Sequence, residues 1–513
     1  MTRPKFFITT PIYYVNAAPH IGHAYSGLAC DVLARFKRLD GYDVHFLTGT
    51  DEHGQKVETA ARNRRVYTRA YCDQVSANFQ ELAKVMKLSN DDFIRTTEPR
   101  HYKSCQALWQ ELDAAGQIYR NSYNGWYSVS DEAYYDAEEI QDDDNGGKVA
   151  PTGSAVEWIE EPSYFFRLSD WQQPLLDFYA ENPDFIQPAS RRNEILRFVE
   201  SGLQDLSISR TKFSWGIPVP NDPDHVMYVW LDALTNYITA LGYPDTEDAR
   251  YQKFWPANVH VIGKEISRFH AIYWPAMLMA AKLPLPTKIY AHGLLMRDGR
   301  KMSKSIGNVV TAQEMIDQIG LDALRYFLMR EVPFGQDGVY SDQTMYARLN
   351  SDLANDLGNL AQRTLSFVAK HSGGQVPNQS VLQAEDTEIL KRGHDLYDSV
   401  RILMDQMAYH RALTEIMALA SEANRYIDAM APWTLRKTDA ERMQSVLYVI
   451  MEILRMIALL LQPFMPDAMA RMLDQLAVPR EARTFADYAS PLQSGAALPT
   501  PEPIFPRLAP PEA

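Results

Sequence analysis

Two short motifs contain the residue types best suited to binding a nucleotide. They are His20-Ile21-Gly22-His23 near the start of the chain and Lys301-Met302-Ser303-Lys304-Ser305 past its middle. Neutral histidines can donate hydrogen bonds to phosphate oxygens without forming tight ion pairs, and lysines bring point charges to the same oxygens. Gly22 fits a place where a large group, such as a base, lies against the backbone. Together the two motifs predict an ATP site.

Each motif has a simpler interpretation when it is taken alone. A His-x-x-His pair can be half of a metal site or two unrelated surface histidines, and a Lys/Ser cluster is usually a solvated loop. Both motifs together, in this order and each within a nucleotide-fold pattern, are much less easily explained by chance. The joint occurrence therefore favours the ATP site.

The first motif opens a predicted helix. An apolar run at 6–8 is followed by a loop rich in Tyr, Asn, Ala and Pro, and then by an amphipathic stretch over 21–39. Backbone N–H groups and the helix dipole favour anions at such an N-terminus. This position suits histidines that contact phosphate.

The first hundred residues have the alternating pattern of an α/β fold. The predicted strands and helices are, in chain order, 6–10, 21–39, 44–48 and a helix from about 55. A strand, a crossover helix and a parallel strand form the unit of a doubly wound sheet, which binds ligands at the carboxyl ends of its strands. His20, His23 and the segment Thr50-Asp51-Glu52-His53-Gly54 emerge there. We therefore expect a Rossmann-like doubly wound parallel sheet with these residues at its site.

The pattern changes twice further along the chain. Short aromatic-rich runs at 116–165 surround Asp142-Asp143-Asp144-Asn145-Gly146-Gly147 and predict a small inserted α+β subdomain. The three aspartates could form a cation site, but no EF-hand spacing follows, so a solvated turn is favoured. After about 341 nearly every segment has a helical period, which predicts an all-α bundle whose methionines are packing residues. The proline-rich end is expected to lack compact structure of its own.

Length and composition restrict the class of protein. The 513 residues suggest about three domains. We find no uncharged apolar run of membrane-spanning length and no signal pattern before the first strand, so we expect a soluble, cytoplasmic protein with no membrane partner. Cys30, Cys72 and Cys105 are widely spaced, and we expect buried thiols, not a disulfide framework or a cysteine zinc knuckle.

The net charge of −14 argues at first against a nucleic-acid partner, because phosphate neutralisation drives such binding. A large protein can nevertheless carry a local basic stripe. Basic residues recur in one predicted helical region, at Arg325, Arg330, Arg348, Arg363 and Lys370. The sequence does not show whether they share a face.

The two motifs in this order resemble the paired signature of class I aminoacyl-tRNA synthetases. Flanking segments narrow the resemblance, over nearly the whole chain, to the methionyl-tRNA synthetases. These segments are Pro11-Ile12-Tyr13-Tyr14-Val15-Asn16, Gly49-Thr50-Asp51-Glu52-His53-Gly54, Tyr228-Val229-Trp230-Leu231-Asp232-Ala233, Gly263-Lys264-Glu265, Phe269-His270 and Ala431-Pro432-Trp433. The resemblance implies that methionine and ATP form methionyl-adenylate and pyrophosphate, and that the terminal adenosine of tRNA(Met) then takes the methionyl group.

The resemblance implies catalytic roles for His20, His23, Lys301 and Lys304, with the lysines on a mobile loop that closes over the triphosphate. Mg²⁺ is the expected companion of ATP, held largely by phosphate oxygens and water. The implied ATP-binding residues are His20, Gly22, His23, Gly263, Glu265, His292, Gly293, Lys301, Ser303 and Lys304. Glu265 stands where many relatives have Asp, which changes its expected ribose contact by one methylene.

The implied methionine-binding residues are Pro11, Ile12, Tyr14, Asp51, Trp230, Tyr237, Ile266, His270 and Trp274. Asp51, at a strand end, is the expected partner of the substrate ammonium; the alternative is that it caps the helix beginning near Gln55. A thioether gains from aromatic contact, and a tyrosine hydroxyl or histidine N–H can point at the sulfur. Any single Trp or Tyr of this set would otherwise be assigned to the core.

The resemblance also assigns residues outside the methionine pocket. Arg210 matches a family arginine near the substrate carboxylate and phosphate, although a lone arginine is more often in a surface ion pair. Asn359, Arg363 and Trp433 match anticodon-contacting positions. Asn359 and Arg363 are four residues apart and share a helix face, and an exposed Trp433 could stack on an unpaired base.

The expected domains are the first half of the catalytic domain (1–115), the inserted connective subdomain (116–165), the second catalytic half (166–295), the lysine-loop and stem-contact region (296–345), the all-α anticodon-binding domain (346–480) and the proline-rich tail (481–513). Without cysteines after Cys105, we expect the connective subdomain to be metal-free and held by aromatic packing. We also expect a monomer, because no appended tRNA-binding domain follows the helices.

Two other hypotheses remain open. The first is a class I synthetase for another apolar amino acid, although the inserted region is short for the editing domain that such enzymes usually need. The second is an inactive relative that only binds tRNA, which the intact signature histidines and lysines disfavour.

Overall fold

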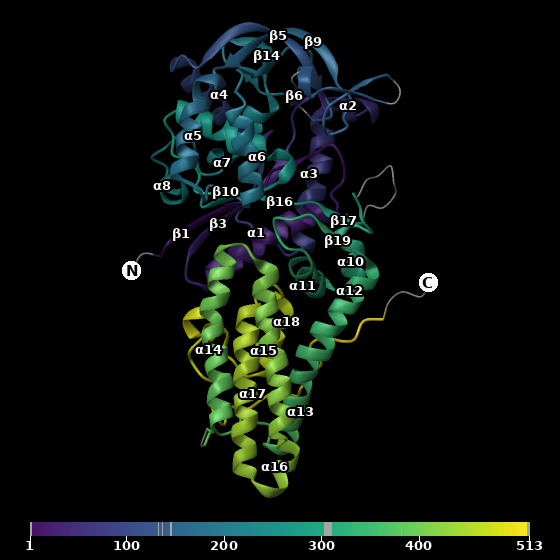
Figure 1. Cartoon of the computed structure of the whole chain (residues 1–513), viewed down its shortest axis with the longest axis vertical. Helices are drawn as coiled ribbons and strands as arrows, with labels where there is room; N and C mark the ends of the chain where they lie inside the picture. Colours follow the sequence, from purple (N-terminus) through teal and green to yellow (C-terminus); the bar gives the residue numbers. More distant parts are fainter. Residues whose placement is uncertain are drawn as a thin grey trace. The chain divides into compact units, whose positions relative to one another are not determined.

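The computed structural model describes residues 3–131, 133–135, 137–143, 146–301, 310–380 and 382–509. The chain divides into two compact units (Figure 1). We call the first the sheet unit; it comprises Lys5–Pro19 and His45–His292. The second, the helical unit, comprises Met1–Pro4, His20–Val44 and Gly293–Ala513.

A seven-stranded sheet forms the centre of the sheet unit. Its strands are β1 (Lys5–Thr9), β2 (Tyr13–Tyr14), β3 (Asp43–Asp51), β4 (Asp92–Arg95), β10 (Ile186–Gln187), β15 (Val259–Gly263) and β16 (Ile289–His292). The order is β10-β16-β15-β1-β3-β2, and β4 also pairs with β3. The registered pairs are parallel, from Ile186↔Ile289 at one side to Thr50↔Arg95 at the other. The prediction of a parallel α/β sheet is confirmed.

The strands of this sheet are apolar on both faces, as expected when helices cover both sides. Phe7, Ile8, Phe46 and Leu47 in the first two long strands are all fully buried. The helices of the unit are α2 (Gln55–Asn63), α3 (Thr68–Val85), α4 (Pro99–Ala114), α5 (Gln172–Glu181), α6 (Ala189–Glu200), α7 (Val229–Thr239), α8 (Ala249–Phe254) and α9 (Trp274–Ala280). One continuous apolar core joins α4, α7 and α9 to the sheet.

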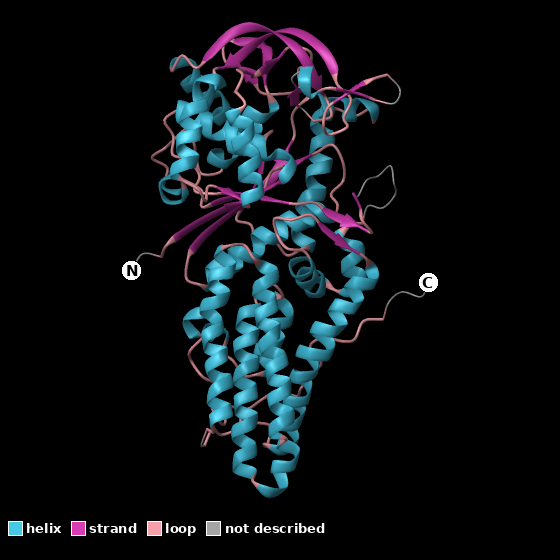
Figure 2. Cartoon of the chain, in the orientation of Figure 1, coloured by secondary structure: helices cyan, strands magenta, loops and turns pink. Residues whose placement is uncertain are grey.

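The predicted connective subdomain contains antiparallel strands (Figure 2). The long strands β5 (Ile118–Ser128) and β9 (Glu157–Phe166) pair along their length, flanked by β6 (Ala133–Tyr135) and β11 (Leu206–Ser207). A second small sheet contains β12 (Ser209–Arg210), β13 (Pro218–Val219) and β14 (Asp222–Met227). The domain boundary at 165 remains a proposal, because β11 joins this sheet from beyond it.

The acidic stretch of the connective subdomain lies in a hairpin between β7 (Gln141–Asp142) and β8 (Lys148–Val149). Asp142 forms an ion pair with Lys148 at 2.6 Å, and the backbone N–H of Gly147 donates to Asp143. Asp144 and Asn145 lie outside the described residues. The described part of the stretch therefore has the geometry of a turn.

Aromatic packing and one carboxylate hold this subdomain. The rings of Trp126 and Trp158 meet edge to face at 5.5 Å. In addition, the Asp131 carboxylate accepts hydrogen bonds from the hydroxyls of Tyr135, Thr152 and Ser154 at 2.5–2.7 Å. The sequence predicted the aromatic packing but not the part played by Asp131.

The helical unit begins with α1 (Ile21–Leu39), whose bounds match the predicted helix. Its other helices are α10 (Ala312–Ile319), α11 (Leu321–Glu331), α12 (Asp342–Leu349), α13 (Asn359–His371), α14 (Ala384–Asp405), α15 (Tyr409–Met430), α16 (Pro432–Thr438), α17 (Ala440–Leu461) and α18 (Pro466–Gln475). A small sheet contains β17 (Leu295–Arg297), β18 (Arg300–Lys301) and β19 (Gly338–Tyr340). A π-helical segment, Asn350–Gly358, lies between α12 and α13.

The long helices α14, α15 and α17 pack against one another (Figure 1). Of the described helices, only α17 is long and apolar enough to cross a membrane, and 94% of that stretch is buried inside the unit. It is the central helix of the bundle. The expectation that the methionines are packing residues is also supported, because Met404, Met451 and Met456 are at most 1% exposed.

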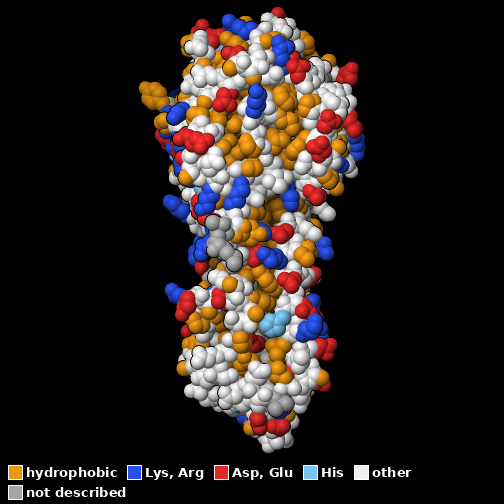
Figure 3. All heavy atoms as spheres, turned by 90° about the vertical axis from the view of Figure 1, so that its left-hand side faces the viewer, with side chains coloured by type: hydrophobic (Ala, Val, Ile, Leu, Met, Phe, Trp, Pro, Cys, Tyr) orange, Lys and Arg blue, Asp and Glu red, His pale blue; other side chains and the backbone are white. Residues whose placement is uncertain are grey.

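The basic residues of the helical region do not form one exposed stripe. Arg325 is fully buried, where its guanidinium donates to Asp31 at 2.7 Å and to the Phe464 carbonyl at 2.9 Å. Arg348 pairs with Glu331 at 3.0 Å. On the face shown in Figure 3, acidic and basic side chains are interspersed.

Two smaller predictions can also be compared with the structure. All three cysteines are buried free thiols, as expected. Within its described residues, the proline-rich tail contains two short 3₁₀ turns, at Arg480–Ala482 and Phe485–Asp487, and an isolated β-bridge between Ala497 and Gln375. It is nevertheless fastened to the bundle, because Glu502 exchanges two backbone hydrogen bonds with the Gln475 side chain at 2.9 and 3.0 Å.

Candidate active site

The two signature histidines form the start of α1. His20 is the N-cap residue, and its Nδ1 accepts the backbone N–H of Gly22 at 3.0 Å. The backbone N–H of His20 in turn donates to Nδ1 of His23 at 3.1 Å. Because a backbone N–H can only donate, both rings accept at Nδ1, and the neutral form of each carries its proton on Nε2. Both side chains can therefore present an N–H donor.

Burial keeps His23 neutral. It lowers the pKa of His23 to about 3, with a further contribution from neighbouring His20. The two rings lie 4.0 Å apart between centroids. The first turn of α1, which is fully described, carries no acidic residue, so the helix dipole is not opposed there. This geometry agrees with the prediction of neutral histidines that can donate hydrogen bonds to phosphate.

Two glycines of the predicted ATP site are required by close packing. A Cβ on Gly22 would lie 2.8 Å from Cε1 of His20, so the large group against this glycine is the neighbouring histidine ring. A Cβ on Gly293 would lie 2.3 Å from the Gln336 backbone. At both positions, contacts within the protein are enough to account for a residue without a side chain. A contact of either glycine with ATP stays a prediction.

The second motif is only partly described. Lys301 ends β18, where its backbone pairs with Met296. Ser303 and Lys304 lie outside the described residues. The chain is described again at Val310, whose carbonyl accepts the backbone N–H of Ile21 at 3.0 Å. The segment after the second motif is thus fastened to the first.

The sheet unit contains a largely apolar cavity of about 190 Å³. Eight of the nine residues predicted to bind methionine line it, namely Pro11, Ile12, Tyr14, Asp51, Trp230, Tyr237, Ile266 and His270. Trp274 instead lies fully buried behind Tyr237, with their ring centroids 6.3 Å apart. The volume is below the 300–1,000 Å³ of sites for drug-sized ligands, and it suits an amino-acid side chain.

The sequence missed several lining residues. Val229 precedes Trp230 on α7, and Ala233 and Leu234 lie three and four residues after it, so helical spacing could have suggested the last two. Lys56, Ser130 and Asp131 also line the cavity. The Lys56 ammonium donates to the Ser130 carbonyl at 3.1 Å and lies 5.6 Å from the centre of the Tyr14 ring. No local sequence signal connects these residues.

Asp51 is the last residue of β3, where it pairs with Tyr14 of β2. It is 7% exposed and lines the cavity, as does one other acidic residue, Asp131. The alternative that Asp51 caps α2 is wrong, because the N-cap residue of α2 is Gly54. The strand end thus holds a carboxylate in an apolar cavity, an arrangement that suits a substrate ammonium.

Stacked aromatic rings form one wall. Trp230 stacks on Phe269 with centroids 3.8 Å apart and planes 6° apart, and it meets His270 edge to face at 6.0 Å. Burial lowers the pKa of His270 to about 4, so its ring is neutral near pH 7. Its Nδ1 donates to the Ile266 carbonyl at 3.0 Å, and its Nε2 accepts from the Tyr237 hydroxyl at 2.8 Å. In this arrangement both protons are used inside the protein, which differs from the expectation that one points at a thioether.

A buried carboxylate ties α7 to the end of β3. Asp232 accepts from His53 at 2.6 Å and from His101 at 2.7 Å. Burial would raise the pKa of the Asp232 carboxyl, but the two histidines hold it at about 2. Asp232 is two residues from Trp230, and His53 is two residues from Asp51. This network therefore fixes the distance between the aromatic wall and the carboxylate.

Other predicted residues lie at strand ends of the same unit. Gly263 and His292 are paired at the carboxyl ends of β15 and β16, and Glu265 is exposed, with an oxygen near Gly263. Arg210 is 3% exposed and lies over the Tyr228 ring at 4.7 Å, with Glu161 3.8 Å away. Its interpretation as a surface ion pair is therefore wrong.

In the helical unit, Asn359, Arg363 and Trp433 come from α13 and α16. Asn359 is exposed, and Trp433 is 41% exposed. The Arg363 guanidinium lies 5.5 Å from the centre of the Trp433 ring and pairs with Asp428 at 2.8 Å. We call Asn359, Arg363, Asp428 and Trp433 the tip cluster. Arg363 and Trp433 are brought together as predicted.

Known proteins match the whole chain. The family described as "tRNA synthetases class I (M)" matches residues 6–365, and the "Anticodon binding domain of methionyl tRNA ligase" matches residues 376–512. A methionine–tRNA ligase of Brucella suis biovar 1 is 57% identical over 508 residues, which cover 99% of this chain and 98% of that protein.

The chain belongs to the methionyl-tRNA synthetase family.

Other members agree with this assignment. The methionine–tRNA ligase of Rhizobium meliloti is 54% identical over 510 residues, with 99% of both chains covered. A structure of Mycobacterium tuberculosis methionyl-tRNA synthetase in complex with methionyl-adenylate has a TM-score of 0.97 to this chain, at 50% identity, and covers 98% of this chain and 100% of that one. The resemblance inferred from the motifs is confirmed, and so is the fold.

One buried cluster in this methionyl-tRNA synthetase family member has metal-ligand chemistry. His101, Cys105 and Asp232 place their ligand atoms within 4.8 Å of one another. However, Nε2 of His101 is already bonded to Asp232, and burial raises the pKa of the Cys105 thiol well above its ordinary value. These atoms satisfy one another as a hydrogen-bonded cluster, so they are a poor fit for zinc.

Proposed function

We propose that this chain activates L-methionine with ATP and transfers the methionyl group to the 3′-terminal adenosine of tRNA(Met). The observation that carries the proposal is the cavity of about 190 Å³ with aromatic walls and Asp51 at its edge. The matched relatives carry this activity in their names. As a member of a translation-enzyme family, the protein is expected to act in the cytoplasm.

In the first step, Asp51 binds the methionine ammonium, and Tyr14, Trp230 and His270 surround the thioether side chain. Thioether sulfur gains from contact with aromatic rings, each by about 0.3–1.5 kcal/mol. Neutral His270 adds no charge to this pocket. A charged or strongly polar side chain would lose hydration without gaining a partner, so the walls select an apolar, polarizable one.

ATP enters as its Mg²⁺ complex, with the metal held by phosphate oxygens and water. His20 and His23 donate from Nε2 to the phosphates, aided by the α1 N-terminus. We assign the remaining nucleotide contacts to Gly263, Glu265, His292 and the lysine motif. Lys301 and Lys304 neutralise the charge that develops on the leaving pyrophosphate.

A methionine carboxylate oxygen attacks the α-phosphorus, and the bond from that phosphorus to the bridging oxygen of pyrophosphate breaks. This forms the methionyl-adenylate. The ribose hydroxyl of the tRNA then attacks its carbonyl carbon and releases AMP. Neither step needs a covalent protein nucleophile, so positioning and charge stabilisation are the contributions left to the protein. The predicted contact of Arg210 with the substrate stays a prediction, since Arg210 lies outside the cavity lining.

For tRNA selection, we propose that Trp433 stacks on an anticodon base while Asn359 and Arg363 read base edges. Their exposure supports this role, because single-stranded loops are read by stacking and hydrogen bonding to splayed bases. The anticodon-domain match over residues 376–512 covers Trp433.

Methionine-dependent exchange between pyrophosphate and ATP tests the proposal, with Val, Ile and Leu measured in parallel. We expect exchange with methionine, and His23→Ala should lower its rate about 100-fold, as loss of one phosphate-stabilising donor does. His394→Ala, at an exposed histidine on α14, is the matched control and should leave exchange unchanged. Exchange with another amino acid alone, or tRNA binding without exchange, would favour the other two hypotheses.

A further inference from the structure

Glu52 is the first residue after β3 and directly follows Asp51. Asp51 lines the cavity, whereas Glu52 is fully buried on the side of β4 and α3. The β2–β3 ladder covers only two residue pairs, Tyr13↔Thr50 and Tyr14↔Asp51. Pairing between β2 and β3 therefore ends at Asp51. Other contacts must fix the backbone conformation after this residue.

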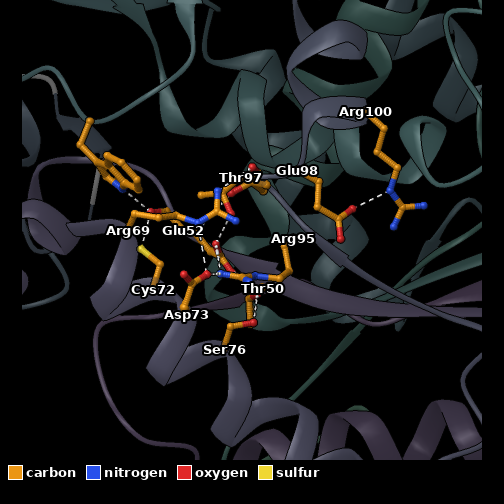
Figure 4. A network of polar contacts seen from close by, with 12 residues as sticks. Thr50, Glu52, Arg69, Cys72, Asp73, Ser76, Arg95, Thr97, Glu98 and Arg100 are labelled. Carbon is orange, nitrogen blue, oxygen red and sulfur yellow. Dashed lines mark hydrogen bonds and ion pairs between the residues drawn. The ribbon is translucent and has the colours of Figure 1, made fainter. Parts of the chain in front are cut away.

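The Glu52 carboxylate is held by four hydrogen bonds (Figure 4). One oxygen accepts from Thr50 Oγ1 at 2.7 Å and from Arg95 Nε at 2.7 Å. The other accepts from Arg95 Nη2 at 3.0 Å and from Thr97 Oγ1 at 2.5 Å. Arg95 and Thr97 belong to the end of β4 and the residues after it, so this carboxylate joins the ends of two neighbouring parallel strands.

The Glu52 backbone is held as well. Its N–H donates to Thr96 Oγ1 at 2.9 Å, and its carbonyl accepts from Trp215 Nε1 at 2.6 Å. The Trp215 carbonyl accepts the N–H of Gly54 at 3.0 Å, and the Trp215 ring meets His53 edge to face at 5.6 Å. The carboxylate, the N–H and the carbonyl of Glu52 thus all have partners, which hold the chain directly after Asp51.

Arg95, the partner of Glu52, is itself held by residues of α3. Arg95 Nη2 also bonds Asp73 of α3 at 2.6 Å, and Arg69 bonds both Asp73 and the Thr97 carbonyl. Burial alone would lower the pKa of Arg95, but Glu52 and Asp73 raise it above its ordinary value. The Arg95 guanidinium therefore stays charged, and its two-pronged contact holds the orientation of the Glu52 carboxylate.

We propose that Glu52 is a positioning residue for amino-acid selection, which sets the direction of the Asp51 carboxylate through the Arg95, Thr97 and Trp215 contacts. The proposal rests on the proposed role of Asp51 in binding the methionine ammonium. A buried bidentate pair is a poor source of net stability, because the desolvation of both charges offsets their attraction. It does fix geometry, and ammonium binding in a small cavity depends on geometry.

The test compares wild type, Asp51→Asn, Glu52→Gln and the double variant in pyrophosphate exchange. Glu52→Gln keeps the size of the side chain but weakens the fork to Arg95. We expect the KM for methionine to rise roughly tenfold while the KM for ATP stays within about twofold, because only the amino-acid contact is misplaced. In the Asp51→Asn background, Glu52→Gln should add little, because the group that it positions is already lost.

A matched control comes from the same strand. At the other end of β4, Asp92 accepts two hydrogen bonds from Arg100, at 2.8 and 3.0 Å. Asp92→Asn makes the same acid-to-amide change in a more exposed fork at the far end of the strand and should leave the KM for methionine unchanged. If Glu52→Gln does not fold, Arg95→Lys keeps the charge, loses the fork and should give the same selective rise in KM.

Four outcomes would overturn the proposal. Equal rises in both KM values, or a Glu52→Gln effect that persists in full beside Asp51→Asn, would mean that Glu52 is merely structural. An unchanged KM for methionine in Glu52→Gln, with a raised KM in Asp51→Asn, would refute this inference alone. An unchanged KM in Asp51→Asn would instead refute the proposed role of Asp51, and this inference with it.

Discussion

The methionine cavity and the tip cluster, to which we assign different substrates, are built differently. Around the aromatic part of the cavity, buried polar side chains hold one another: His270 uses both ring nitrogens, and Asp232 bonds two histidines. In the tip cluster, Trp433 is 41% exposed and Arg363 has an exposed partner in Asp428. The cavity is fixed before its ligand arrives, and the tip cluster is left accessible.

The difference follows from the two recognition problems. A small amino acid offers few contacts, so selection depends on groups held at fixed distances in a region from which water is excluded. An RNA loop offers large flat bases and can change shape to meet an exposed ring. Substitutions should therefore have larger effects on stability in the cavity supports than in the tip cluster.

The largest effect is expected at Asp232. Asp232→Ala leaves His53 and His101 without their buried acceptor and should lower the free energy of unfolding by about 3–5 kcal/mol, as breaking a buried pair does. Asp428→Asn, which removes an exposed partner of Arg363, should cost about 0–1 kcal/mol. Denaturant unfolding measures both. Similar decreases in the free energy of unfolding for the two variants would contradict the proposed difference between the cavity supports and the tip cluster.

The pH dependence of the free energy of unfolding should depend more on a buried histidine of the cavity than on an exposed histidine of the helical unit. Burial lowers the pKa of His270 to about 4, from about 6.5 in the unfolded chain. The unfolded state therefore binds a proton that the folded state does not, so stability is fully present above pH 6.5 and falls by about 3 kcal/mol towards pH 4. His270→Gln should flatten this slope in denaturant midpoints measured between pH 7 and 4.5.

The control for His270 is His371, a histidine of the helical unit. His371 ends α13 and contacts Arg436 at the exposed surface. His371→Gln should change the pH slope much less than His270→Gln does. A larger change for His371 would mean that burial is not what sets the pH dependence.

A smaller effect is expected at Tyr237, whose hydroxyl donates to His270 at 2.8 Å. Tyr237→Phe leaves a buried acceptor unsatisfied, a cost of about 1–3 kcal/mol, and should raise the KM for methionine roughly tenfold without changing the KM for ATP. Tyr251→Phe is the control, because Tyr251 is buried in the same unit but does not line the cavity. Equal changes in KM from both variants would contradict a specific role for the Tyr237–His270 bond.

At the tip cluster, a substitution should change tRNA charging without changing the free energy of unfolding. Trp433→Ala should leave unfolding and pyrophosphate exchange unchanged but lower kcat/KM for tRNA charging roughly tenfold, because base stacking contributes about 1–3 kcal/mol. Trp433→Phe keeps a stacking ring and should lose less. Loss of exchange in Trp433→Ala would indicate a structural role instead.

Local patterns predicted some elements closely because their causes are local. Helix α1 has the predicted bounds because its cap, its apolar spacing and the residues after it are neighbours in the chain. Within the region of helical period after 341, the segment Asn350–Gly358 is π-helical, which periodicity over a long window does not reveal. Trp274 has the residue type of a pocket wall, but it packs one layer behind Tyr237.

The contacts that complete the cavity could not be predicted, because they join distant parts of the chain. Lys56 bonds Ser130, and Glu52 bonds Trp215, across 74 and 163 residues. Each of these residues, taken alone, has an ordinary surface or core interpretation. Only the folded sheet and its insertion bring them together.

The sequence by itself determined the family, the ATP-type motifs, the parallel α/β pattern and the apolar residues around Asp51, since these depend on residue type and short spacing. The tertiary structure decided which aromatic residues line the cavity, which histidines are neutral, and that Glu52 and Asp232 hold the cavity walls. Those properties depend on burial and on hydrogen bonds between strand ends. Such contacts exist only after distant segments have packed together.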